Sequence, residues 1–200
     1  MRFAGKLTRY AQSLFFYRLI FAVWTVIIAS GPAFPAEIPD VNIRIAGNEL
    51  YVSASLNLDN KTLEDIDKGI SKELVFHIDL FRVWEAWPDE FVTGRKIIKA
   101  LKINPIKREF TGSSIDGNLH TEKRFRDISS MLAWATSITE LKLTNFKELE
   151  PGIYFIKLTA ESFLRKMPPV INYMVFFTPE KEFSVSKNSA TFSLNKAAAQ

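Results

Sequence analysis

Apolar and polar residues alternate along much of the chain after residue 40, the pattern of strands that bury one face. Residues 41–45 alternate in this way up to a turn at Gly47-Asn48. From Leu50 to Leu58, apolar residues then occupy every second position. A period of two places these side chains on one side of a strand. The pattern predicts two half-buried strands at the start of a domain.

The remaining pattern predicts more strands than helices. Helical spacing of apolar residues predicts two helices, a short one opening near Thr62 and one of about four turns beginning near Asp127. Turn residues delimit the other segments, which predict strands at 72–87, 91–103, 106–115, 118–124, 153–164 and 170–178, and a strand pair at 182–194. We therefore expect a mainly β (α+β) fold, an antiparallel Ig-like β-sandwich with two helices. It would span residues 41–194, with a flexible tail at 195–200.

The start of the chain has a different character. Leu19–Ala29 is an uninterrupted apolar run, and Arg2, Lys6, Arg9 and Arg18 are the only charged residues among the first 36. A basic flank before a short apolar run is typical of an export signal, and the flank stays on the cytoplasmic side of the membrane. This pattern predicts that the rest of the chain is exported.

Two alternatives remain for the leader, because its apolar run is short for a membrane span and the residues after it fit a cleavage site poorly. Residues 1–30 are expected to be a cleaved signal peptide or an uncleaved membrane anchor. Residues 31–40 contain three prolines and are expected to form a tether. The domain would then lie in the periplasm, either free or anchored to the inner membrane and facing the periplasm.

The net charge of +4 does not predict a nucleic-acid-binding protein. Four of the 26 basic residues lie in the leader, which leaves 22 basic residues against 22 acidic ones. A protein that binds nucleic acid needs a standing basic surface to neutralise phosphates. The chain also has no cysteine, so the domain must be stabilised by apolar burial rather than by disulfides.

No set of residues in the sequence predicts catalysis or the binding of a cofactor or metal. The two histidines are far apart in the sequence and have no cysteine near them, whereas a metal site needs several ligands at defined spacing. The G-x-S-x-G motif of serine hydrolases is absent. We interpret these side chains as core or surface residues: His77, His120, Ser113-Ser114, and the carboxylate pairs Asp65 with Asp67 and Asp89 with Glu90. The chain is expected not to be an enzyme.

An aromatic cluster at the end of a predicted strand is a candidate interaction surface. Period two places Arg82 and Trp84 on one face of the strand, and Phe81 and Trp87 on the other. Exposed tryptophans can stack on a sugar ring or bind a protein partner. The alternative is that these aromatic residues fill the core or rim of the sandwich.

A basic segment follows the aromatic cluster, and we include Arg95 and Lys99 in the candidate surface. Period two places these two residues on one face of the strand, and Lys96 and Lys102 on the other. Such a segment can meet anionic lipid headgroups near the membrane. The alternative is a solvated strand edge that lysines protect from pairing with other chains.

Several segments resemble an uncharacterised bacterial family, domain-of-unknown-function family 4390. The segments that carry the resemblance are LYVSASLNLDNKTLEDIDKGI (50–70), FRVWEAWPDE (81–90), RKIIKALKINPIKREF (95–110), RFRDISSMLAWATSI (124–138), PGIYFIKLTAESFLRKMPP (151–169) and EFSVSKNSATF (182–192). The resemblance implies an envelope protein behind a signal or anchor segment. It also implies a gene for a nitrogen-regulation-type sensor histidine kinase as a frequent neighbour, and it implies no catalytic residues.

We therefore expect an exported, non-catalytic protein-interaction module. Unpaired strand edges, which any open sheet offers, are the usual template for binding a partner's strand. The resemblance suggests the extracytoplasmic part of a sensor histidine kinase as the partner. The alternative is a periplasmic domain that binds lipid or glycan, which would require an apolar cleft or an exposed Trp84.

Export can be tested with a reporter fused after Gln200. A reporter enzyme that is active only in the periplasm should be active in this fusion, because the basic residues before Leu19 hold that end in the cytoplasm. Activity from a cytoplasm-specific reporter alone would contradict the prediction.

Overall fold

The computed structural model describes residues 35–104, 106–164 and 180–194, which belong to one compact unit. This unit begins at Pro35. Ala36 and Ile38 are buried, and Glu37 pairs with Asn57 through two backbone hydrogen bonds. The second half of the expected tether therefore packs against the strands that follow it.

The smaller of two antiparallel sheets contains β1 (Val41–Ala46), β2 (Glu49–Ser55) and β7 (Ser137–Asn145), in the order β1-β2-β7. The first two strands form the expected hairpin, and Ala46 pairs with Glu49 across the turn. Gly47 has a φ of 59°, a left-handed conformation that glycine adopts without steric cost. A two-residue loop with glycine in its first position matches the twist of the strands that it joins.

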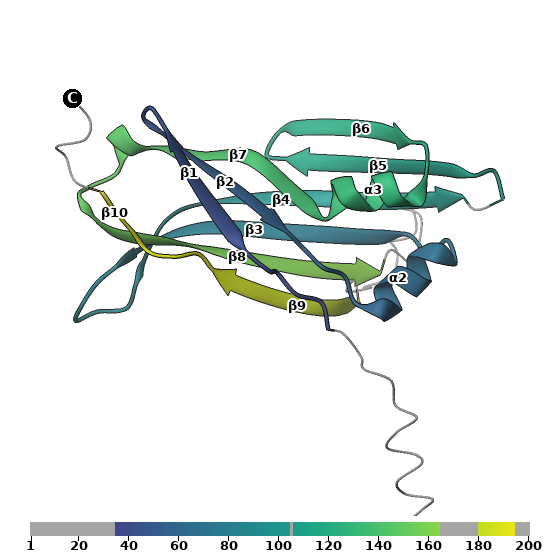
Figure 1. The fold of residues 1–200 in the computed structure, drawn as a ribbon, viewed down its shortest axis with the longest axis horizontal. Coiled ribbons are helices and arrows are strands. Elements are labelled where there is room, and N and C mark those ends of the chain that lie inside the picture. The colour runs from purple at the N-terminus through teal and green to yellow at the C-terminus, as the bar shows by residue number, and fades with distance from the viewer. Residues whose placement is uncertain (1–34, 105, 165–179, 195–200) are drawn as a thin grey trace, which may run out of the picture. The chain divides into compact units, whose positions relative to one another are not determined.

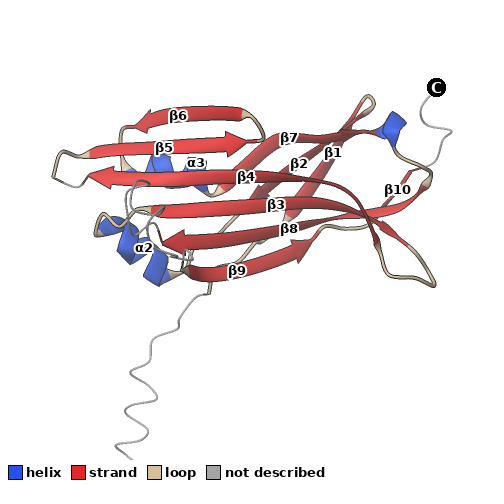
Figure 2. Ribbon diagram, turned by 180° about the vertical axis from the view of Figure 1, so that it is seen from behind, coloured by secondary structure: helices blue, strands red, loops and turns tan. Residues whose placement is uncertain are grey.

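The larger sheet has seven strands. Six follow the order β10-β8-β3-β4-β5-β6, and β9 also pairs with β8 (Figures 1 and 2). These strands are β3 (Lys72–Val83), β4 (Glu90–Asn104), β5 (Glu109–Asp116), β6 (Leu119–Phe125), β8 (Gly152–Leu164), β9 (Lys181–Asn188) and β10 (Phe192–Leu194). Gly117, with a φ of 58°, makes the predicted turn between β5 and β6. The mainly β fold with two antiparallel sheets is confirmed.

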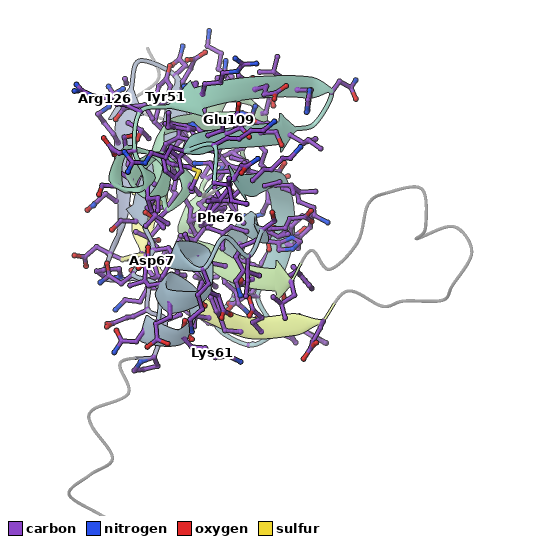
Figure 3. The ribbon with its side chains drawn as sticks, turned by 90° about the vertical axis from the view of Figure 1, so that its right-hand side faces the viewer. Tyr51, Lys61, Asp67, Phe76, Glu109 and Arg126 are labelled. Carbon is purple, nitrogen blue, oxygen red and sulfur yellow. The ribbon has the colours of Figure 1, made fainter. Side chains whose placement is uncertain are left out.

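The core lies between the two sheets, and strand β3 supplies its centre. Leu74, Phe76, Ile78 and Leu80 alternate along β3 and are all buried. Figure 3 shows Phe76 in the middle of the molecule, between the layers. Ile156 and other alternate residues of the neighbouring β8 are buried on the same face.

Helix α2 (Asn60–Asp67) lies where the sequence predicts a helix, and Asp59 is its N-terminal cap. The Asp59 carboxylate accepts a hydrogen bond from the Thr62 backbone N–H at 2.7 Å. Thr62 itself is buried inside the first turn. Asp59 therefore satisfies one of the free N–H groups at the helix start.

Helix α3 (Ile128–Ala135) begins after the Asp127 cap as predicted, but it is half the expected length. Residue Ile138, expected on the last turn of this helix, lies in β7. Its side chain is buried, so the helical spacing reflected contact with the core rather than a continuing helix. Thr136, Ile138 and Thr139 are β-branched, which favours a strand at this point.

Other elements also differ from the predictions. The long strand β3 ends at Val83 rather than at Trp87. The expected final strand pair does not form, because β9 and β10 both pair with β8 and not with each other. Between them, the Ser189 N–H donates to the Ile156 carbonyl and the Ser189 hydroxyl accepts from the Ile156 N–H, so the chain continues along β8. The predicted leader, the strand at 170–178 and the tail at 195–200 lie outside the described residues.

A buried ion-pair cluster joins α2 to the larger sheet. The Lys72 side chain is fully buried, and its ammonium lies 2.7 Å from Asp65 of α2 and 2.5 Å from Glu182 of β9. The Ser162 hydroxyl donates to the other oxygen of Glu182 at 3.0 Å. Lys72 lowers the pKa of the Asp65 carboxyl through their hydrogen bond. Every charge in this cluster has a partner, which burial requires.

We predict that Lys72→Met destabilises the domain by about 3–5 kcal/mol, because it leaves two carboxylates without their cation. Lys68→Met is the matched control, since Lys68 forms only an exposed pair with Glu64 one helical turn away. That change should cost less than about 0.5 kcal/mol. Urea titrations of both variants provide the measurement, and equal losses would contradict the prediction.

Candidate interaction surface

The candidate surface is the end of the β3–β4 hairpin, residues 81–91, which we call the aromatic hairpin. It projects past the ends of the neighbouring strands (Figures 1 and 2). Trp84 is 44% exposed, Trp87 76% and Phe91 57%. Three large aromatic side chains in water on one projecting turn are unusual for a monomeric surface and are typical of a contact site.

Three phenylalanines support the base of the aromatic hairpin on the face of the larger sheet opposite the core. Phe81 stacks on Phe155 of β8, with ring centroids 5.4 Å apart, and meets Phe91 edge-to-face at 5.9 Å. Phe91 lies opposite Phe81 because the register of β3 and β4 shifts by one residue at this point. This β-bulge redirects the Phe91 side chain. Phe91 is not among the residues predicted for this surface, because alternation alone does not reveal a bulge.

Arg82 and Trp84 come together as predicted from their spacing. The Arg82 guanidinium lies 4.5 Å from the centre of the Trp84 ring. It also forms an ion pair with Glu150 at 2.7 Å and donates to the Pro151 carbonyl at 2.9 Å. Each of these contacts favours the charged form, and the hydrogen bond to Glu150 raises the pKa of Arg82. The tryptophan is thus held in a defined position before any partner binds.

A glycine makes room for this arrangement. A Cβ atom at Gly152 would lie 2.9 Å from Nε of Arg82, closer than side chains tolerate. The guanidinium can therefore pass close to the backbone at the start of β8. At the edge of the Trp84 ring, Nε1 donates a hydrogen bond to the Glu90 carboxylate at 3.2 Å. Both the face and the edge of the Trp84 ring are thus held.

Carboxylates surround the aromatic hairpin. Glu85, Asp89 and Glu90 belong to the hairpin itself and are exposed, and Glu150 lies beside it. The guanidinium of Arg82, the basic group at this position, is already engaged by Glu150 and Trp84. The rim of the candidate surface is therefore acidic, and it would repel anionic lipid headgroups.

Arg95 does not belong to this surface. It lies on β4, where its guanidinium forms a two-pronged ion pair with Asp116 of β5, each bond 2.9 Å long. The same group donates to the Lys142 carbonyl of β7 at 2.5 Å. Arg95 therefore bridges the larger and the smaller sheet.

Lys99 is buried between the sheets, so the interpretation of this segment as a solvated strand edge is wrong. Strand β4 lies inside the sheet, between β3 and β5. The Lys99 ammonium donates to the carbonyls of Trp134 at 2.7 Å and Ser137 at 2.5 Å, and it lies 5.0 Å from the centre of the Trp134 ring. A cation beside the last carbonyls of a helix is favourable, and here it caps α3. Burial nevertheless lowers the pKa of Lys99 to about 8.

A second group of charges lies on the outer face of the larger sheet. Glu161 binds Lys181 at 2.5 Å, and His77 Nε2 is 3.9 Å from Glu161. That separation is too long for the hydrogen bond that would orient a catalytic histidine. Burial raises the pKa of Asp79 nearby, where Gly94 leaves room for its carboxylate. This group acts as a set of cross-strand charge pairs.

Within the described ranges, no three His, Cys, Asp or Glu side chains gather closely enough to hold a metal ion. In that same part of the chain, no helix has the length and apolar character needed to cross a bilayer.

Together these features define an antiparallel β-sandwich domain with a projecting, acidic-rimmed aromatic hairpin. The family profile described as Domain of unknown function (DUF4390) matches residues 33–191, and the chain belongs to this family. The matched range covers the aromatic hairpin and every strand of the two sheets except β10, which begins at Phe192. Comparison with curated proteins and with solved structures found no significant match.

The burial of Lys99 predicts an unusual pH dependence of stability. Its pKa is about 8 in the folded domain against an ordinary value of 10.5, so between these values the unfolded chain binds more protons. Stability from this group therefore rises with pH, because the neutral amine escapes the cost of burying a charge and still donates to both carbonyls. Between pH 7 and pH 10 we expect a gain on the order of 2–3 kcal/mol relative to Lys99→Met. Urea titrations at both pH values measure it, with Lys96→Met as the matched control, and identical pH dependence in wild type and Lys99→Met would refute it.

Proposed function

We propose that this protein is a non-catalytic protein-interaction module of the bacterial envelope, which binds its partner through the aromatic hairpin. The observation that carries the proposal is the exposure of Trp84, Trp87 and Phe91 on a turn whose geometry is fixed by Arg82. Tryptophan and arginine are the residues that contribute most to protein–protein binding. Because Trp84 is already held in place, binding there loses little side-chain freedom.

The charge of the rim supports a protein partner over a membrane surface. An apolar centre surrounded by Glu85, Asp89, Glu90 and Glu150 would be repelled by the anionic headgroups that a lipid-binding domain meets. The basic, apolar leader supports an envelope location. A sensor histidine kinase, the partner suggested by the family resemblance, is one candidate for the protein that this hairpin binds.

A glycan-binding domain is the second candidate function, and one observation favours it. The Trp87 ring is exposed over most of its surface and can stack on a sugar, while neighbouring carboxylates can accept hydrogen bonds from hydroxyl groups. In the envelope, peptidoglycan would be the available glycan.

Site-specific photo-cross-linking in cells distinguishes the two functions. A photoreactive phenylalanine analogue at Trp87 should produce a protein adduct that mass spectrometry can identify, and the same analogue at exposed Lys123 of β6 should not. In the protein with the analogue at Trp84, Trp87→Ala should lower the adduct yield at least fivefold without changing the melting temperature, because Trp87 is exposed. Absence of an adduct at both tryptophans, with retention of purified protein on peptidoglycan fragments, would favour the glycan function instead.

A further inference from the structure

Among the described residues, strand β1 of the smaller sheet is paired on one side only, and we call its other side the free edge. It pairs with β2, and no described residue pairs with its other side. The two-residue turn makes Ala46 and Glu49 a hydrogen-bonded pair, and hydrogen-bonded and non-hydrogen-bonded pairs then alternate along the ladder. The backbone N–H and C=O groups of Val41, Ile43 and Ile45 therefore point away from β2, toward the free edge.

The other strands at the margins of the two sheets carry features that discourage pairing with another chain. Strand β10 has only three residues, and β6 carries Glu122, Lys123 and Arg124 in succession. Strand β9 has an inward-pointing charge, Glu182, bound to Lys72. On β7, carbonyl groups already accept hydrogen bonds from side chains of β4. Short length, charged residues and inward-pointing charges are the usual protections of an edge.

Strand β1 lacks these protections. Its one charged residue, Arg44, lies on the outer face of the sheet, where it stacks on Tyr51 and forms an ion pair with Glu140. Along the core-facing side, Val41 and Ile43 are only half-buried and Ile45 is 51% exposed. An apolar, uncharged strand edge that is partly exposed to solvent is a template for the addition of another strand.

The larger sheet extends beyond this edge and determines what can bind there. In Figures 1 and 2, β9 and β10 lie past the free edge of β1, in the other layer. Their core-facing apolar side chains are also half-buried: Phe183, Val185, Phe192 and Leu194. A second copy paired edge to edge with β1 would bring its own large sheet into the layer that β9 and β10 occupy. A single strand can lie beside β1 and over these residues without that conflict.

We propose that the free edge of β1 accepts one extended segment of a partner protein as a fourth strand of the smaller sheet. The segment matches the six residues of β1 and carries apolar side chains at alternate positions, which would cover the half-buried residues of β1, β9 and β10. Its remaining positions are polar and face solvent beside Arg44. This site is separate from the aromatic hairpin and does not depend on the function proposed for it.

The test supplies such a segment within the same molecule. The full chain is extended after Gln200 with a flexible glycine-serine linker of about 20 residues, which spans roughly 25 Å, and the strand Ser-Val-Thr-Ile-Thr-Val-Ser. Amide hydrogen exchange is then measured by NMR. The amides of Val41, Ile43 and Ile45 should exchange at least tenfold more slowly than in the unextended chain, and the melting temperature should rise. The matched control carries the same seven residues with the apolar ones placed consecutively, and it should give no protection.

A second variant shows whether the backbone edge itself binds the strand. Ile43→Pro removes one edge-facing N–H without removing a hydrogen bond to β2, and edge positions of this kind tolerate proline. In the extended chain it should abolish the protection of Val41 and Ile45, whereas Ile43→Val should preserve it. Unprotected β1 amides in a folded extended chain, protection of β6 or β9 instead, or equal protection by the control strand would each overturn the proposal.

Discussion

The architecture depends on one strand that is paired on both sides and apolar on one face. Strand β3 pairs with β4 and with β8 over nearly its whole length, and its alternate residues from Leu74 to Leu80 are fully buried. Burying four such side chains stabilises the fold by roughly 6–12 kcal/mol before the cost of ordering the chain is subtracted. The smaller sheet and α3 pack on the face that β3 makes apolar. The same strand continues into the aromatic hairpin, so the surface that we propose for binding is directly connected to the central strand of the core.

Much of the fold could be predicted because its determinants are local. The alternation of apolar and polar residues predicted the positions of strands β1 to β6 and β8. Glycines in two tight turns predicted the β1–β2 and β5–β6 hairpins. The predictions were wrong where a distant partner decides the structure. Ile138 is apolar at helical spacing, yet it belongs to a strand because β2 pairs with that segment. Ser189 keeps β10 on β8 through contacts with Ile156, more than thirty residues away in the sequence.

The residues of the candidate surface also fall into two groups, those whose contacts follow from local spacing and those whose contacts come from distant segments. The pairing of Arg82 with Trp84 follows from their spacing on one strand, and the structure confirms that contact. The sequence predicts a solvated Lys99 because lysine is usually solvated. Its burial is tolerable because the Trp134 carbonyl of α3 and the Ser137 carbonyl at the start of β7 accept its hydrogen bonds. Arg95 is similar, since Asp116 and the Lys142 carbonyl both come from other strands. An alternating pattern therefore predicts the face of the strand on which an ionisable residue lies, but not whether that face is exposed to solvent.

The buried Lys72 cluster has a consequence for how the chain reaches its native state. Lys72 and Asp65 are close in sequence, whereas Glu182 follows Lys72 by 110 residues. Until that last carboxylate arrives, the ammonium has only one of its two anionic partners, and burying it is unfavourable. A chain that emerges from a ribosome with its N-terminus first exposes β3 long before β9. We therefore expect the central strand to stay solvated at this end until nearly the entire domain has emerged, which favours late, cooperative folding.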